Sequence, residues 1–195
     1  MNVNRVAAFL VCAVVSGSSV PQAPVETLSG KRLELSRDVA SGLAVLIIGF
    51  TKASRAQTSE WSRRLQPELS KTFSAQVYEV AVVADVPRLI RGLVIRQIRA
   101  SVPRAIHPHF LLVLEHANVW RRLADAVDEN AAYLVLVSHG EVVWRGAGRL
   151  TEVSYQSLIQ ALKALSQDSA SSEHGERVPF NLRLQRTPSA SPPSL

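Results

Sequence analysis

The strongest constraint on the fold comes from an apolar run, Leu43 to Phe50, which leads through a polar elbow, Thr51 to Ser54, into a helical pattern. The run is nearly continuous and has the length of a buried central strand. After the elbow, apolar residues recur at a spacing of four, which is typical of the buried side of a helix. This pattern predicts a helix from Arg55 to Phe73, in which Pro67 should produce a kink or an early end. The residues that set the spacing are Trp61, Leu65 and Leu69.

Strands and helices alternate along the rest of the chain. Gly30 marks the turn of a β-hairpin expected from Glu26 to Val39, and a second hairpin is expected from Tyr133 to Trp144. A loop at Arg145–Gly148 follows, and Thr151 is a suitable N-cap for a closing helix. Further strands are expected at Gln76–Val83 and Phe110–Leu114, and further helices at Pro87–Ala100 and Val119–Val127. The apolar face of the closing helix is expected to comprise Val153, Leu158, Ile159, Leu162 and Leu165. This order predicts an α/β fold in which helices cover a central mixed sheet with an N-terminal β-hairpin.

The N-terminal end of the chain has the composition of a secretory signal peptide. A short basic segment, MNVNR, precedes an apolar run of about a dozen residues, and small residues follow. We therefore predict a signal peptide over residues 1–23, cleaved between Gly17 and Ala23, and export to the periplasm of a Gram-negative bacterium. The alternative is an uncleaved membrane anchor, although the run is shorter than the roughly 20 apolar residues that span a bilayer. Cys12, the only cysteine, lies inside this signal, so the mature chain would contain no thiol.

The C-terminal end changes to a composition rich in Ser, Pro, Arg and Gln. Residues 168–195 have no periodic apolar pattern and are predicted to be disordered. The folded domain is therefore expected over residues 24–167. A hydrophobic content of 47% with 19% charged residues is sufficient for a globular core in a domain of this size.

Several short motifs carry a resemblance to a known superfamily. They are Gln57 and Trp61 on the first long helix, Tyr133-Leu134 on a core strand, and Val143 to Gly148 before the last helix. With the order of elements, these residues resemble the thioredoxin-like superfamily, including the N-terminal hairpin of its peroxiredoxin-type members. The pattern is also similar to the mitochondrial ATP synthase assembly factor family and its bacterial thioredoxin-like relatives. The resemblance implies a thioredoxin-like three-layer sandwich and an assembly or chaperone-like role.

The sequence departs from that superfamily at the redox site. Peroxiredoxins place a threonine three residues before the reactive cysteine, and here Thr51 precedes Ser54 at that spacing. The chemistry requires a thiolate, whereas a serine hydroxyl does not ionise comparably and cannot form a mixed disulfide. The proline that commonly precedes the third core strand is also missing from Glu129–Ala132. We therefore predict a degenerate, non-catalytic elbow without a cofactor, in which Ser54 caps the helix. A nucleophilic Ser54 would need a histidine and a carboxylate that no motif supplies.

Four arginines form the most suggestive surface. Arg88, Arg91, Arg96 and Arg99 fall within an arc of about 140° on one side of the predicted helix at 87–100, opposite an apolar side. The formal net charge is +6, so this face could bind an acidic protein partner or an anionic membrane surface. The alternative is an ordinary solvated face of a helix that covers the sheet. Nucleic acid is not expected, because the protein is predicted to be exported and lacks aromatic residues interleaved with the basic ones.

Three histidines form a second group of candidates. His107 and His109 flank Pro108 and could project to the same side of an extended segment, with His116 further along the chain. The alternative is a loop with solvated histidines.

The first hypothesis is thus a non-catalytic, exported thioredoxin-like protein that acts by binding, as an assembly or chaperone-like factor for an envelope complex. The second is a thiol-free metal-binding protein or enzyme that uses the three histidines. The sequence leaves the oligomeric state open.

Overall fold

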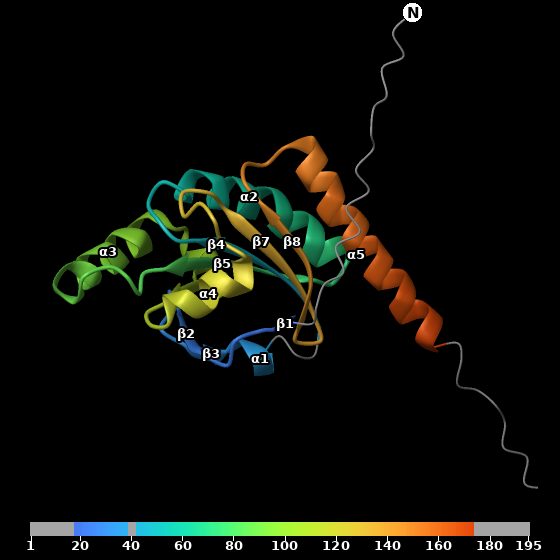
Figure 1. The fold of residues 1–195 in the computed structure, drawn as a ribbon, viewed down its shortest axis with the longest axis horizontal. Coiled ribbons are helices and arrows are strands. Elements are labelled where there is room, and N and C mark those ends of the chain that lie inside the picture. Colours follow the sequence, from blue (N-terminus) through green and yellow to red (C-terminus); the bar gives the residue numbers. More distant parts are fainter. Residues whose placement is uncertain (1–17, 39–41, 174–195) are drawn as a thin grey trace, which may run out of the picture.

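The computed structural model describes residues 18–38 and 42–173, which form an eight-stranded mixed sheet with helices around it (Figure 1). The strands are β1 Ser18–Ser19, β2 Pro24–Thr27, β3 Arg32–Glu34, β4 Leu43–Gly49, β5 Gln76–Val82, β6 Phe110–Val113, β7 Tyr133–Ser138 and β8 Glu141–Ala147. The helices are α1 Leu35–Asp38, α2 Arg55–Thr72, α3 Arg88–Ser101, a 3₁₀ helix η1 Arg104–His109, α4 Ala117–Ala124 and α5 Glu152–Glu173.

The strand order in the sheet is β1-β8-β7-β4-β5-β6-β2-β3. The central strands β4, β5 and β6 are parallel, and β7 and β8 add to β4 as an antiparallel hairpin. The N-terminal hairpin of β2 and β3 pairs with β6 in antiparallel orientation. The expected fold class, an α/β fold with a central mixed sheet and an N-terminal hairpin, is confirmed.

Helices cover both faces of the sheet, which explains the continuous apolar run in β4. Leu46 and Ile48 point to the core beneath α4, where Trp120 is fully buried. Val45 and Ile47 point to the core beneath α2 and α5, which contains the fully buried Trp61. Because β4 is buried on both sides, apolar residues occupy both of its faces.

Three local expectations were wrong. The early end expected at Pro67 is wrong: α2 continues to Thr72, because Pro67 is exposed and the backbone carbonyl that it leaves unpaired can be solvated. The second arm of the N-terminal hairpin ends at Glu34, where the Asp38 carboxylate accepts a hydrogen bond from the Glu34 amide at 3.0 Å and a short helix begins. The residues expected in a loop after Trp144 extend β8 as far as Ala147.

The closing helix is confirmed, with two corrections. Thr151 caps α5, because its Oγ1 accepts a hydrogen bond from the Ser154 amide at 3.1 Å. Val153 is 82% exposed and therefore lies outside the apolar face, whereas Leu158, Ile159 and Leu162 are buried. α5 continues to Glu173, beyond the predicted end of the folded domain at 167.

The apolar side of α3 differs most from expectation. This helix lies at one end of the molecule (Figure 1), and none of its residues is buried. Ile95 and Ile98 pack partly against Phe110 and Leu112, but Leu89 is 99% exposed and Leu93 is 65% exposed. The helix is amphipathic, yet only part of its apolar side contacts the sheet.

The two predicted terminal segments lie mostly outside the described residues. This applies to Cys12 and to most of the predicted signal peptide, although Ser18 and Ser19 form β1 and Val20 is buried. It also applies to the predicted tail from residue 174 onward. Among the described helices, none combines the length and apolar character needed to cross a bilayer.

Candidate binding site at the elbow

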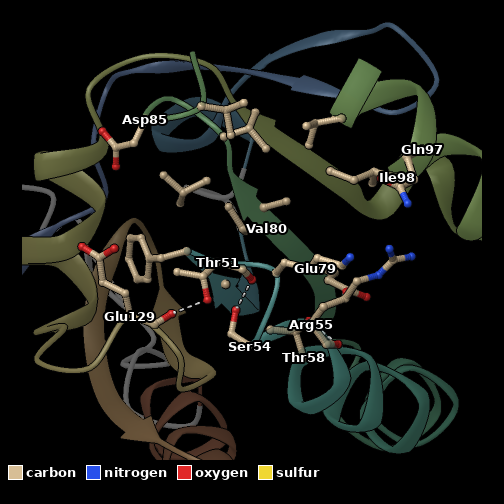
Figure 2. Close-up of a pocket in the computed structure, with 18 of the residues that line it drawn as sticks. Thr51, Ser54, Arg55, Thr58, Glu79, Val80, Asp85, Gln97, Ile98 and Glu129 are labelled. Atoms are coloured by element: carbon tan, nitrogen blue, oxygen red, sulfur yellow. Dashed lines mark hydrogen bonds between the residues drawn. The ribbon is translucent and has the colours of Figure 1, made fainter. Parts of the chain in front are cut away.

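A cavity of about 490 Å³ opens between the elbow, the first turns of α2, the end of β5 and α3. Most of its wall is apolar, with Val80, Val94 and Ile98 among the lining residues. Figure 2 shows Asp85 and Glu129 toward one end and Gln97 and Ile98 toward the other, with Thr51, Ser54 and Glu79 between. The site lies at the carboxyl ends of parallel strands, where open α/β sheets commonly bind ligands.

The elbow serine is packed and already hydrogen-bonded. Ser54 is fully buried, and its Oγ donates to the Thr51 carbonyl oxygen at 2.9 Å. It makes no side-chain hydrogen bond to the amides of α2, so the expected helix cap is wrong. Gly49 leaves space for this arrangement, because a Cβ at that position would stand 2.8 Å from Ser54 Oγ. The hydroxyl thus consolidates the elbow.

The loop before β7, at residues 129–132, contains no proline. Hydrogen bonds with Thr51 and Gln57 hold it in place instead. The Thr51 hydroxyl lies 3.2 Å from the Glu129 carbonyl oxygen and 3.0 Å from Asn130 Oδ1. Gln57 Oε1 accepts a hydrogen bond from the Ala132 amide at 3.2 Å, and its Nε2 donates to the Asn130 carbonyl at 3.3 Å. These side chains fix the loop that faces the elbow.

The other residues that carry the resemblance also connect elements. Trp61 Nε1 donates to the Gly148 carbonyl at 3.0 Å, and the Gly148 amide donates to the Ala132 carbonyl at 2.8 Å. Gly148 has φ of +96°, a conformation that favours glycine. Arg145 Nε donates to the Leu123 carbonyl at 2.7 Å and so joins β8 to α4. The residues on which the resemblance rests therefore connect α2, the loop before β7, β8 and α4.

Glu79 is a site residue that the sequence reasoning missed. It lies on β5, is only 7% exposed and lines the cavity. Its Oε1 accepts hydrogen bonds from Thr58 Oγ1 at 3.0 Å and from Ser59 Oγ at 3.5 Å. Burial raises the pKa of Glu79, while hydrogen bonds from Thr58, Ser62 and Ser59 and the positive charge of Arg55 act in the opposite direction. The available signal was a carboxylate in the middle of a mostly apolar strand.

An ion-pair network borders the opposite end of the cavity. Arg121 on α4 pairs with Asp85 and, at 2.6 Å, with Glu129, both of which line the cavity. Its guanidinium also lies 5.8 Å from the centre of the Phe50 ring. The hydrogen bonds with Glu129 and Asp85 raise the pKa of Arg121. One guanidinium thus meets two carboxylates, and a net negative charge stays at this end of the cavity.

The four arginines on α3 have different surroundings. Arg91 donates hydrogen bonds to three backbone carbonyls, those of Ala84 at 2.7 Å, Val86 at 2.9 Å and Leu114 at 3.2 Å. It thereby fastens the helix to the loops beside it. The three arginines that remain exposed are Arg88, Arg96 and Arg99.

The three histidines are not arranged as a metal site. His107 and His109 lie in η1, where a 3₁₀ geometry turns residues two apart to different sides, so the expected extended segment is wrong. His107 Nε2 lies 3.0 Å from the Val102 carbonyl oxygen, and His116 lies 3.9 Å from Glu115. Among the side chains that the structure describes, those of residues 19–38 and 42–167, no group of three or more from His, Cys, Asp or Glu could share a metal ion.

Comparison with known proteins gives a likeness in structure but not in sequence. No protein-family model and no curated protein matches the chain. The structure is similar to BsSco, a member of the Sco family of cytochrome c oxidase assembly proteins, with 13% identity and a TM-score of 0.54 over 78% of this chain and 95% of that one.

Two further solved structures show the same likeness. A putative thiol:disulfide interchange protein DsbE from Chlorobium tepidum is 20% identical, with a TM-score of 0.53 over 75% of this chain and 96% of that one. The exposed lipoprotein thioredoxin Etrx1 from Streptococcus pneumoniae is 12% identical, with a TM-score of 0.53 over 74% and 99%. The narrower resemblance to the ATP synthase assembly factor family stays a prediction. The fold shared with these structures is the thioredoxin-like fold.

Proposed function

We propose that this protein is an exported, non-catalytic binding protein that acts as an assembly or chaperone-like factor for an envelope complex. Its only cysteine is Cys12, in the predicted signal peptide, and Ser54 stands where peroxiredoxins carry their reactive cysteine. The Ser54 hydroxyl is buried and hydrogen-bonded to the elbow itself. Disulfide exchange needs a thiolate, so the mature chain acts through its surface.

The observation that carries the proposal is the exposed apolar side of α3 beside the mouth of the cavity. Leu89, Ile90 and Leu93 are large, exposed apolar residues on this one helix, and Ile90 also lines the cavity. Exposed apolar residues gathered on one element, next to an apolar cavity, are characteristic of interaction sites.

Charge indicates the chemistry of the partner. Arg88, Arg96 and Arg99 are exposed on α3, and this helix contains no acidic residue. The partner that complements it is a protein segment with apolar residues to cover the leucines and carboxylates to meet the arginines. Arg91 belongs to the helix attachment and does not belong to this surface.

The proposed setting follows from the predicted export signal. One structural neighbour, BsSco, belongs to a family of assembly proteins, so an assembly role is compatible with this fold. Burying one leucine side chain contributes about 1.5–3 kcal/mol, which corresponds to roughly 10-fold to 100-fold in affinity. One substitution on α3 should therefore give a measurable effect.

Site-specific photocrosslinking in cells tests the proposal. A photoreactive phenylalanine analogue replaces Leu93 in one variant and Val153, exposed on α5, in a matched control. We expect the probe at position 93 to crosslink one defined envelope protein and the probe at 153 not to do so. The purified partner should then bind Leu93→Glu at least 10-fold more weakly than wild type, and Val153→Glu as tightly as wild type.

A second arm separates a protein partner from a membrane surface. The purified protein is sedimented with vesicles that contain an anionic phospholipid and with neutral vesicles. Binding to the anionic vesicles without any crosslinked protein would contradict the proposal in favour of a lipid surface. Equal crosslinking from positions 93 and 153 would also contradict it, because contact would then not depend on α3.

A further inference from the structure

The cavity contains a buried carboxyl group, Glu79, that forms no direct ion pair among the residues whose side chains are described, although the positive charge of Arg55 acts on it. Glu79 accepts hydrogen bonds from the hydroxyls of Thr58 and Ser59, but no ion pair reaches it from the side chains that the structure describes, those of residues 19–38 and 42–167. Buried carboxylates in proteins are usually paired with a cation because hydroxyls alone offset only part of the lost hydration. This group therefore offers an unfilled position for a positive charge.

The positive charge that acts on Glu79 is that of Arg55, which opposes the rise in the Glu79 pKa but forms no ion pair with the carboxyl group. Arg55 lines the same side of the cavity (Figure 2), but its guanidinium donates to Ser101 Oγ at the end of α3. Asp85 and Glu129, toward the other end, share the single positive charge of Arg121 and are partly exposed to solvent, whereas Glu79 is buried. Lys52 lines the cavity and is exposed to solvent.

The rest of the cavity is suited to an apolar body. Val94 and Ile98 on α3 line one wall, and Phe110 at the start of β6 also contributes. The volume of about 490 Å³ lies within the range of roughly 300–1,000 Å³ that is usual for small-molecule sites. A site with an apolar wall and one buried carboxyl group favours a ligand that has an aliphatic part and ends in a hydrogen-bonding cation.

We propose that the cavity between α2 and α3 binds an ammonium group on an aliphatic chain, with the ammonium at Glu79 and the chain against α3. The ammonium donates hydrogen bonds to the carboxylate and neutralises it, and the chain removes the apolar wall from water. This site is inside the cavity and shares Ile90 with the proposed partner surface, whereas Leu89 and Leu93 of that surface do not line the cavity.

Binding of three ligands that differ only in the head group tests the proposal. Octylamine, octanol and octanoate share one apolar chain and carry a positive, neutral and negative head, respectively. Titrations below the critical micelle concentration, followed by ¹H–¹⁵N NMR of the purified protein, give the three dissociation constants. We expect octylamine to bind at least 10-fold more tightly than octanol and octanoate to bind most weakly, with shifts at residues lining the cavity.

Two variants connect the preference to Glu79. Glu79→Gln keeps an oxygen acceptor for Thr58 and should remove the preference for octylamine while leaving octanol affinity within 2-fold. Glu60→Gln, an exposed glutamate on the same helix as Thr58, is the matched control and should keep the preference. Thermal unfolding and the NMR spectrum establish that both variants fold.

The remaining arm identifies the source of the ammonium group. A short peptide with a lysine between two leucines is titrated beside octylamine. Preferential binding of the peptide assigns the site to a lysine side chain of a protein, and preferential binding of octylamine assigns it to a free amphiphilic amine. Equal affinity for octanol and octylamine, or an unchanged preference in Glu79→Gln, overturns the proposal.

Discussion

The close approach of α2 to β4 predicts that Gly49→Ala destabilises the elbow. An alanine Cβ would lie 2.8 Å from Ser54 Oγ and 3.1 Å from Thr58 Cγ2, both closer than ordinary contacts. The side chain of Ser54 or the first turn of α2 must therefore shift, and overpacking of this kind costs about 1–3 kcal/mol. We expect the free energy of unfolding to fall by that amount.

A double-mutant cycle with Ser54→Ala locates the cause. Ser54→Ala alone loses the hydrogen bond to the Thr51 carbonyl, at a cost of about 1 kcal/mol. It also removes the oxygen nearest to the added methyl group, so the double variant should be more stable than the sum of the single effects by about 1 kcal/mol. The next nearest contact, with Thr58 Cγ2, accounts for what remains of the cost.

Urea unfolding measures all of these variants. The fluorescence of the buried Trp61 and Trp120 reports loss of both cores. Gly92→Ala is the control, because a Cβ there meets nothing within 4 Å, and it should be neutral or stabilising by up to about 1 kcal/mol. A Gly49→Ala variant as stable as wild type, or strictly additive effects in the cycle, would refute the packing argument.

Two further predictions concern the elbow and Glu79. In a Cys12→Ala background, the thiol of Ser54→Cys should react slowly with a thiol reagent in the native protein and rapidly in denaturant, because the position is fully buried; rapid native reaction would show that the elbow opens. The second prediction is a pH dependence, because burial raises the pKa of Glu79 in the folded state. The contribution of Glu79 to the free energy of unfolding is therefore fully present below the pKa of the unfolded state and is lost as pH rises through the pKa of the folded state. The free energy of unfolding of wild type minus that of Glu79→Gln should therefore fall with rising pH in this window, by at most about 1.4 kcal/mol per pH unit, and a pH-independent difference in denaturant titrations would contradict it.

The sequence predicts the order of elements well because each carries a local signal. The apolar run of β4 reflects burial on both faces, and Thr151 caps α5 through its own side chain. The alternating pattern also placed both hairpins at their turns. These features depend on neighbouring residues, so they can be recognised without the tertiary structure.

The surroundings of the candidate site depend on contacts between distant segments. Periodicity identifies the apolar side of α3, but it does not reveal that Leu89 and Leu93 extend past the sheet. Arg91 has the spacing of a surface residue, yet it bonds to carbonyls in two separate loops. Glu79 is opposite Ile47 in the register of β5 with β4, and only this register places its carboxyl group under α2.

The pairing of β1 with β8 means that cleavage of the predicted signal peptide would determine how the sheet ends. Ser18 and Ser19 pair with Val142 and Glu141, and the Val20 amide donates to the Gly140 carbonyl at 3.0 Å. Cleavage before Ser18 keeps this strand, whereas cleavage at a later bond of the predicted window, after Val20, removes it. The second product exposes unpaired amides and carbonyls along the outer edge of β8, onto which an extended segment of another chain can add as a new strand. The position of the cleaved bond would thus determine whether the outer edge of β8 is paired with β1 or is free to pair with another chain.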